Sequence, residues 1–277
     1  MSSVHRVRWG RHRLLVVGGV LVAIFVLTAV FAPLVAPYSP YSLNVSVMLR
    51  PPSWSHILGT DELGRDELSR VIFAARISME VGLVAVAVGV TGGTTVGIVS
   101  AHFGGIADLG MMRFMDLLFS FPAILLALIL MASLGTGILP AMIAIGIVFI
   151  PGFARLTRVA TMQVLRQQYV DAARTIGMSD GRILLREILP NVIAPVLVEA
   201  AVAFSYAVIL ESALSFLGLG AQPPVPSWGN MINTGRSFLD RAPWLGIVPG
   251  VTLFFCVLGF NLLGDGLRDA LDPHLRE

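Results

Sequence analysis

The sequence contains no lysine, because all nineteen of its Lys or Arg positions hold arginine. P-loop ATPases hold nucleotide phosphates with a lysine, and Schiff-base enzymes use a lysine amine as nucleophile. The chain therefore lacks the residue that either mechanism needs. We expect it to bind no cofactor of its own, and any ATP-driven work to be done by ATP and magnesium on a separate subunit.

Cysteine and charge are almost as scarce. Cys256 is the only cysteine and lies in an apolar run, which excludes a disulfide framework and a thiolate zinc site and leaves a packed thiol as its expected role. Charged residues make up 13% of the chain, against about 25% in a soluble domain. With 56% hydrophobic residues and a mean hydropathy of +0.82, the composition predicts an all-α polytopic membrane protein.

Six apolar blocks are long enough to cross about 30 Å of hydrocarbon as helices. They lie near residues 14–36, 78–101, 117–134, 137–154, 192–216 and 245–264. The first follows four arginines, as in a signal peptide, but its apolar run of about 23 residues is too long for a cleaved signal, so we expect an uncleaved anchor. Pro122, Pro151 and Pro249 are expected to kink or interrupt the third, fourth and sixth blocks.

The arginines are distributed unevenly between the two sides that six spans define. Thirteen lie on the side that holds both termini and the loop between the fourth and fifth blocks, and six lie on the other side. Cytoplasmic loops of membrane proteins are enriched in Lys and Arg. Both termini and that loop are therefore predicted to be cytoplasmic.

The second block carries a ridge of small residues at every fourth position. The ridge consists of Ala85, Gly89, Gly93, Gly97 and Ala101. Small residues at this spacing allow helix backbones to approach closely in a membrane. We expect a structural helix contact, either within this chain or with a partner subunit.

The longest polar stretch in the second half of the chain is the loop at residues 160–191. An apolar stripe at helical spacing is formed by Leu165, Tyr169, Ala172 and Ile176. This stripe predicts a first helix, which Gly177 is expected to end in a left-handed conformation. Ser179 or Asp180 is expected to cap a second short helix that runs to Leu189, after which Pro190 turns the chain back into the membrane.

The same loop contains a motif that resembles the cytoplasmic coupling loop by which bacterial ABC importer permeases dock on an ATPase subunit. The matching residues are Asp171, Ala172, Ala173, Gly177, Leu189 and Pro190. Two positions depart from the family pattern, since Asp171 replaces the usual Glu and Glu187 replaces Ile. Without the pattern, an arginine-rich amphipathic helix lying on the lipid surface is an equal alternative.

A second distinctive string, residues 56–83, follows the first block. Its acids are Asp61, Glu62, Asp66 and Glu67, and the nearby arginines are Arg50, Arg65, Arg70 and Arg76. This mixture favours internal ion pairs over a metal site. Asp66 is expected to cap a helix in which Arg70 lies one turn on.

This string, residues 211–231 and the C-terminal NLLGDGLRDALDPHLRE also resemble permeases of the dipeptide, oligopeptide and nickel importer class, in particular the shorter second permease subunit. The resemblance implies the type I ABC importer permease fold. It divides the chain into an N-terminal helix and external segment (1–77), a permease core (78–265) and a cytoplasmic tail (266–277). It also implies the bacterial cytoplasmic membrane as location.

The resemblance further implies the partners. These would be the lipid bilayer, a homologous second permease, two ATPase domains on the cytoplasmic side and an external solute-binding protein, with no role for nucleic acid. The segment from Leu217 to Pro243, with Trp228 and the following Trp244, is expected either to form part of the binding-protein platform or to lie in an interfacial aromatic belt.

Acidic residues within spans need an explanation, because each costs a few kcal/mol at the middle of a membrane. Glu211 lies near the outer end of the fifth span, where we expect it to be solvated or paired. Glu199 lies deeper and is a candidate cavity-lining or arginine-paired residue. Glu80 and Asp116 lie near span ends, where an acid is cheap.

Other functions remain open. A proton-coupled transporter would also be apolar, although the sequence shows no internal repeat. An intramembrane enzyme would need a nucleophile and a base, and no HExxH or GxSxG string occurs. Within the resembled class, spans with no histidine and one thiol favour short peptides over a bare nickel ion, although a nickel complex needs no ligands from the passage.

Overall fold

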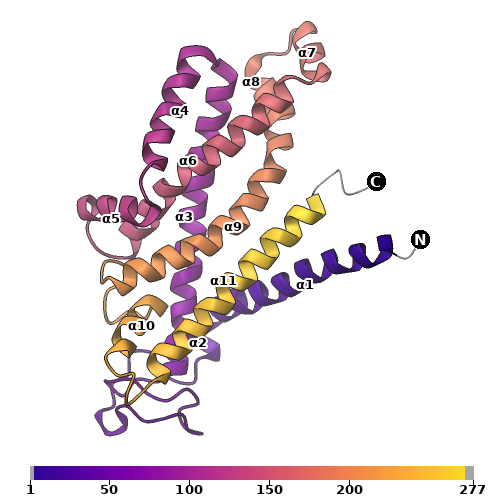
Figure 1. Ribbon diagram of the computed structural model, residues 1–277. Coiled ribbons are helices and arrows are strands. Elements are labelled where there is room, and N and C mark those ends of the chain that lie inside the picture. Colours follow the sequence, from indigo (N-terminus) through magenta and orange to yellow (C-terminus); the bar gives the residue numbers. More distant parts are fainter. Residues whose placement is uncertain (1–2, 272–277) are drawn as a thin grey trace.

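A computed structural model describes residues 3–271, and this part of the chain is built from helices without a named strand. In chain order the helices are α1 (Ser3–Val30), α2 (Ala32–Val35), η1 (Val45–Val47), α3 (Glu67–Phe103), α4 (Gly105–Phe119), α5 (Ala123–Leu134), α6 (Ile138–Leu165), α7 (Gln168–Thr175), α8 (Asp180–Ile183), η2 (Leu184–Ile188), α9 (Leu189–Phe216), α10 (Trp228–Arg236) and α11 (Trp244–Leu271). The loop with α7 and α8 lies at one end, and α10 with the segment before α3 lies at the other (Figure 1). The end of the predicted tail, residues 272–277, falls outside the described part.

Five helical stretches are long and apolar enough to cross a membrane. They are residues 13–30 of α1, then α3, α6, the continuous stretch from α8 to α9, and α11. A sixth arises if α4 and α5, which are bent by 95° at their junction, count as one broken span. The expected six-span, all-helical architecture therefore holds with one bent member.

The predicted third span at residues 117–134 is wrong in shape. It straddles the bend between α4 and α5, while residues 105–116, which the hydropathy placed in a loop, form most of α4. Pro122 explains the break, because it has no N–H and its ring keeps Phe121 from continuing a helix. Pro122 becomes the N-cap of α5, and its carbonyl accepts the Leu126 N–H at 3.0 Å.

The second, fourth and fifth spans are longer than predicted. Helix α3 begins at Glu67, and the Asp66 carboxylate caps it by accepting the Ser69 N–H at 2.8 Å, as expected. Helix α6 continues through Pro151 to Leu165. Pro190 does not turn the chain, because it occupies the first turn of α9, where a missing N–H is tolerated. The preceding residues 184–188 are wound as a π-helix, in which the Leu189 N–H bonds to the Leu184 carbonyl.

The small-residue ridge packs within the subunit, against α6. A Cβ atom added at Gly89 would lie 2.7 Å from Phe149 Cβ, and one at Gly97 would lie 2.8 Å from Thr157 Cβ. Gly93 faces the backbone of α6 between them. Ala85 is fully buried and Ala101 only partly. The close approach of the two helices therefore explains the three glycines of the ridge.

Trp228 anchors a second apolar cluster, with residues such as Val71, Ala75 and Phe260. Its side chain is fully buried, and its Nε1–H donates to the Val71 carbonyl at 3.2 Å. Trp228 is therefore not part of an interfacial aromatic belt. It fixes α10 onto the start of α3. Cys256 is buried in the same cluster, which agrees with its expected role as a packed thiol.

Candidate functional site

The α7–α8 loop contains a sharp helix corner. Gly177 has φ of +81°, and the Met178 N–H donates to the Ala173 carbonyl at 3.0 Å while the Gly177 N–H donates to Arg174 at 2.9 Å. These bonds satisfy carbonyls at the end of α7 in the pattern of a Schellman motif. The left-handed conformation predicted for Gly177 is present. No atom lies within 4 Å of a Cβ added there, so the backbone conformation, not crowding, favours glycine.

Helix α7, the first helix of this loop, differs from its prediction in extent and in buried face. It begins at Gln168, after the chain breaks at Arg166, and covers eight residues. Its buried side chains are Val170 and Ala173, which join the main apolar core. The predicted stripe is instead largely exposed, since Tyr169 is 43% and Ile176 79% accessible.

This inversion leaves an outward surface of mixed character. Asp171 and Ala172 are exposed while Ala173 is buried, so two of the three residues of the Asp-Ala-Ala motif are available to a partner. Leu185, 68% accessible, extends the apolar part onto the π-helix. An exposed apolar strip on a short, tightly cornered helix pair is suited to fitting into a groove of another protein.

Leu189 and Pro190 do not form a turn beside that surface, because both belong to the start of α9. Leu189 is partly buried, and Pro190 is exposed at the first turn of α9. The Asn191 side chain donates to the Glu187 carbonyl at 2.6 Å and to Tyr169 Oη at 3.3 Å. The second helix of the loop, α8, is continuous through the π-helix with span α9, so the loop and the span are joined without a flexible link.

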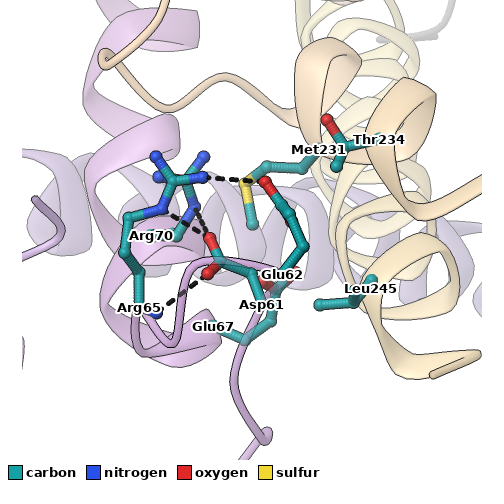
Figure 2. A pocket seen from close by; sticks show the side chains of 8 residues that line it. All are labelled: Asp61, Glu62, Arg65, Glu67, Arg70, Met231, Thr234 and Leu245. Atoms are coloured by element: carbon teal, nitrogen blue, oxygen red, sulfur yellow. Dashed lines mark hydrogen bonds and ion pairs between the residues drawn. The ribbon is translucent and has the colours of Figure 1, made fainter. Parts of the chain in front are cut away.

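The acids and arginines around the start of α3 form most of the ion pairs that the sequence predicted, although Arg50 donates to the Ser46 carbonyl and pairs with no acid among the described residues. Arg65 Nε binds Asp61 Oδ2 at 2.6 Å, and Arg70 Nε lies 3.4 Å from the same oxygen. Figure 2 shows both guanidinium groups beside the Asp61 carboxylate, with Met231, Thr234 and Leu245 of α10 and α11 opposite. Asp66 pairs with His56 at 2.9 Å. Arg76 pairs with Glu80 at 3.1 Å, on the exposed surface of α3.

Glu67 is the exception in this cluster. Its side chain is buried, and its Oε1 atom has no hydrogen-bond partner among the described residues. The adjoining cavity of about 10 Å³ has room for no more than a water molecule. Within residues 13–271, whose side chains are described, no group of three or more His, Cys, Asp or Glu is arranged to hold a metal ion.

The two acids of α9 have different surroundings. Glu199 is exposed and lines an open cavity of about 480 Å³ between α6, α9 and α11, together with Asp265 and Arg268. The cavity-lining position predicted for Glu199 is therefore present. Glu211, predicted to be solvated or paired, is only 1% accessible and forms no ion pair among the described residues. Hydroxyl groups surround it instead, from Ser215 at 2.7 Å and from Ser78 and Ser212 at 3.4 Å.

The segment from Leu217 to Pro243 is partly exposed at the end opposite α7, so its predicted part in a binding-protein platform stays a prediction. Much of the segment from Leu217 to Pro243 is packed inward around Trp228, and Trp244 donates to the Thr60 carbonyl at 3.3 Å. The prominent apolar side chains at this end belong to the segment before α3, where Trp54 is 103% and Val45 77% accessible. Isolated apolar residues in a loop gave no periodic signal by which the sequence could identify them.

The sequence also missed two ion pairs that join α4 to α6. Arg158 binds Asp108, and Arg155 binds Asp116 at 2.8 Å. The partners are 39 and 50 positions apart, and all four residues lie outside the predicted spans. No spacing within a single helix could have indicated pairs at this separation.

The comparisons with known proteins agree with this geometry. Residues 93–277 match the model of the family described as binding-protein-dependent transport system inner membrane component, and residues 5–52 match the N-terminal TM domain of oligopeptide transport permease C. The chain is 42% identical to a dipeptide transport system permease protein of Alkalihalophilus pseudofirmus, over 96% of this chain and 88% of that one. It is 44% identical to a di/tripeptide transport system permease protein of Pseudomonas aeruginosa, over 94% and 88%.

Two further similarities concern cargo and fold. A glutathione transport system permease protein of Escherichia coli is 42% identical, over 97% of this chain and 89% of that one. A solved structure of the MetNI methionine ABC transporter in inward facing conformations superimposes with a TM-score of 0.60 at 17% identity, covering 73% of this chain and 96% of that one. At that identity the superposition shows the fold alone, which is that of an ABC importer permease.

Proposed function

The chain belongs to the family of inner membrane components of binding-protein-dependent transport systems, and we propose that it forms, with a second permease, the membrane passage of an ATP-driven importer of short peptides. It is a transport subunit and not an enzyme. Peptides are proposed as the transported substrate because relatives at 42 to 44% identity are named for dipeptide, di/tripeptide and glutathione transport.

The partners follow from the family and from the α7–α8 loop. A homologous permease would complete the passage, an external binding protein would deliver peptide, and two ATPase domains would bind ATP and magnesium beneath the membrane. The exposed surface of Asp171, Ala172, Tyr169 and Ile176 supports docking of an ATPase. Its apolar strip would otherwise stand in water next to buried Val170 and Ala173.

The covalent path from this surface into the membrane supports coupling. Helix α8, the π-helix and α9 form one continuous helical stretch, Asp180–Phe216. A displacement of α8 therefore moves the cytoplasmic half of α9, including the wall of the Glu199 cavity. ATP binding and a loaded binding protein would each bias the same two-state permease pair through contacts that differ between its states.

Growth on peptides tests the cargo. A strain that lacks this gene should lose growth on defined dipeptides and tripeptides as the source of a required amino acid, and should keep growth on the free amino acid. The wild-type gene should restore growth on peptides. Unimpaired growth on every peptide length, together with loss of a nickel-dependent enzyme activity, would replace the peptide cargo with a nickel complex.

Thiol labelling tests the orientation, in which we place both termini and the α7–α8 loop in the cytoplasm. With Cys256 replaced by serine, a cysteine at Arg182 should react with an impermeant reagent only after permeabilisation. A cysteine at Trp54, which is fully exposed, should react in intact cells. Asn230 is a poorer external reporter because it is partly buried and bonded to the Ala221 carbonyl. Labelling at position 182 from outside would overturn the proposed topology.

A further inference from the structure

Helix α4 has little apolar packing to hold it in place. Met115 is the one residue of this helix that is buried. Ile106 is 89% and Leu109 56% accessible, and a cavity of about 600 Å³ opens beside α4 and α6. Close-packed side chains fix most helices of this protein relative to one another. The position of α4 must depend on other contacts.

Two ion pairs supply these contacts. Arg158 donates from Nε to Asp108 Oδ1 at 2.6 Å and from Nη2 to Oδ2 at 2.5 Å, and the Ser100 hydroxyl of α3 bonds to the same carboxylate. Arg155 Nη2 donates to Asp116 Oδ1 at 2.8 Å, and its guanidinium lies over the Phe119 ring at 4.2 Å. We call Asp108, Asp116, Arg155 and Arg158 the α4–α6 clasp. A two-pronged, charge-assisted pair fixes orientation as well as distance.

The geometry of the clasp fits an antiparallel helix pair. The two acids are eight residues apart, about 12 Å along α4, and the arginines three apart, about 4.5 Å along α6. The long arginine side chains span this difference. Since Asp108 lies near the start of α4 and pairs with the arginine nearer the end of α6, the two pairs join the helices at two levels. A rotation or slide of α6 would therefore carry α4 with it.

The clasp lies close to the coupling loop along α6. Arg158 is seven residues, about 10 Å, before Leu165, where α6 ends, and α7 begins at Gln168. Helix α3 also contacts the loop, since His102 Nε2 at the end of α3 lies 3.9 Å from Asp180 Oδ2 at the start of α8. Beyond the clasp, α4 leads through the 95° bend into α5.

We propose that the α4–α6 clasp transmits displacement of the α7–α8 loop to α4 and α5, and that Asp108 and Arg158 are positioning residues of the transport cycle. The proposal rests on the function proposed above, because it assumes that an ATPase moves this loop. Without the clasp, α6 would move while α4 stayed behind, since Met115 is the one buried side chain that α4 contributes. ATP hydrolysis would then continue without response to the binding protein.

The test uses the complete complex of both permeases, the ATPases and the binding protein in proteoliposomes. The variants Asp108→Arg and Arg158→Asp each place two like charges together, and the double exchange restores an opposite pair. We expect each single variant to keep basal ATPase activity, while the stimulation of that activity by loaded binding protein falls at least about ten-fold. The double exchange should recover most of the stimulation. Single variants with wild-type stimulation, or a double exchange as impaired as the singles, would overturn the proposal.

A conservative variant and a distance measurement separate loss of the clasp from misfolding and from a wrong assignment of the transported substrate. Asp108→Asn keeps the shape of the side chain and is expected to assemble with stimulation reduced; wild-type stimulation in this variant counts against the clasp. In a Cys256→Ser background, spin labels at exposed Ile106 and Leu197 should report an ATP-dependent distance change that the single exchanges abolish. This measurement needs no peptide, so it distinguishes failure of the clasp from failure of the proposed cargo.

The matched control is the Arg76–Glu80 pair of α3. It has a similar distance of 3.1 Å, but its side chains are about half exposed and both lie on one helix. Because this pair connects α3 to no second helix, the same charge exchange there should leave the stimulation of ATPase activity unchanged.

Discussion

Replacing Gly93 by leucine is expected to abolish the folded permease. A Cβ atom at this position would collide with Phe153 Cβ and lie 2.7 Å from the Ile150 carbonyl oxygen and 2.9 Å from the Ala154 nitrogen. Backbone atoms cannot rotate away as a side chain can, so α3 and α6 would have to separate along the ridge. Overpacking in a core typically costs about 1 to 3 kcal/mol, and a clash with backbone lies at the upper end.

The amount of monodisperse protein after detergent extraction and its thermal midpoint measure this effect. Gly110→Leu is the matched control, because it also lies within a helix but nothing lies within 4 Å of its added Cβ. Gly92→Leu should be intermediate, since it meets the flexible Ile150 side chain at 3.0 Å. Wild-type yield and thermal midpoint for Gly93→Leu would show that α3 and α6 do not pack as closely along the ridge as the structure indicates.

The features that the sequence predicted well are those that local patterns encode. Apolar length located the spans, four-residue spacing located the α3 ridge, and Asp66 and Gly177 marked a helix start and a helix corner. Each of these depends on neighbours within one or two turns, which a sequence displays directly. The mixture of acids and arginines at residues 61–70 likewise predicted internal ion pairs, and Arg65 forms two of them, with Asp61 and Glu62.

The features that the sequence missed depend on long-range contacts or on context. Hydropathy placed most of α4 in a loop and joined its last residues to α5, because it does not show the backbone bend at Phe121 and Pro122 that divides the two helices. Pro190 was read as a break, although a proline in the first turn of a helix continues it. The apolar stripe of α7 faces outward because Val170 and Ala173 reach the core instead. The Asp108–Arg158 pair joins residues 50 positions apart.

Replacing Gly177 by valine is expected to abolish peptide uptake while membrane insertion remains normal. Gly177 holds φ of +81°, where an ordinary side chain costs about 1 to 2 kcal/mol and a β-branched one more. Because no atom surrounds the added Cβ, the cost falls on the corner between α7 and α8 and not on the core. The corner should therefore open, which changes the angle between α7, which presents Asp171 and Ala172, and α8, which leads into α9.

Uptake in whole cells, co-purification of the ATPase and the yield of membrane-inserted protein measure this prediction together. Gly181→Val is the matched control, since Gly181 lies on the same loop, has no atom within 4 Å of its added Cβ and does not have a positive φ. We expect normal insertion for both variants, with loss of ATPase co-purification and of uptake only for Gly177→Val. If Gly177→Val retains both, the corner does not set the docking surface. If Gly181→Val fails equally, the loop tolerates no added side chain and the left-handed conformation is not the cause.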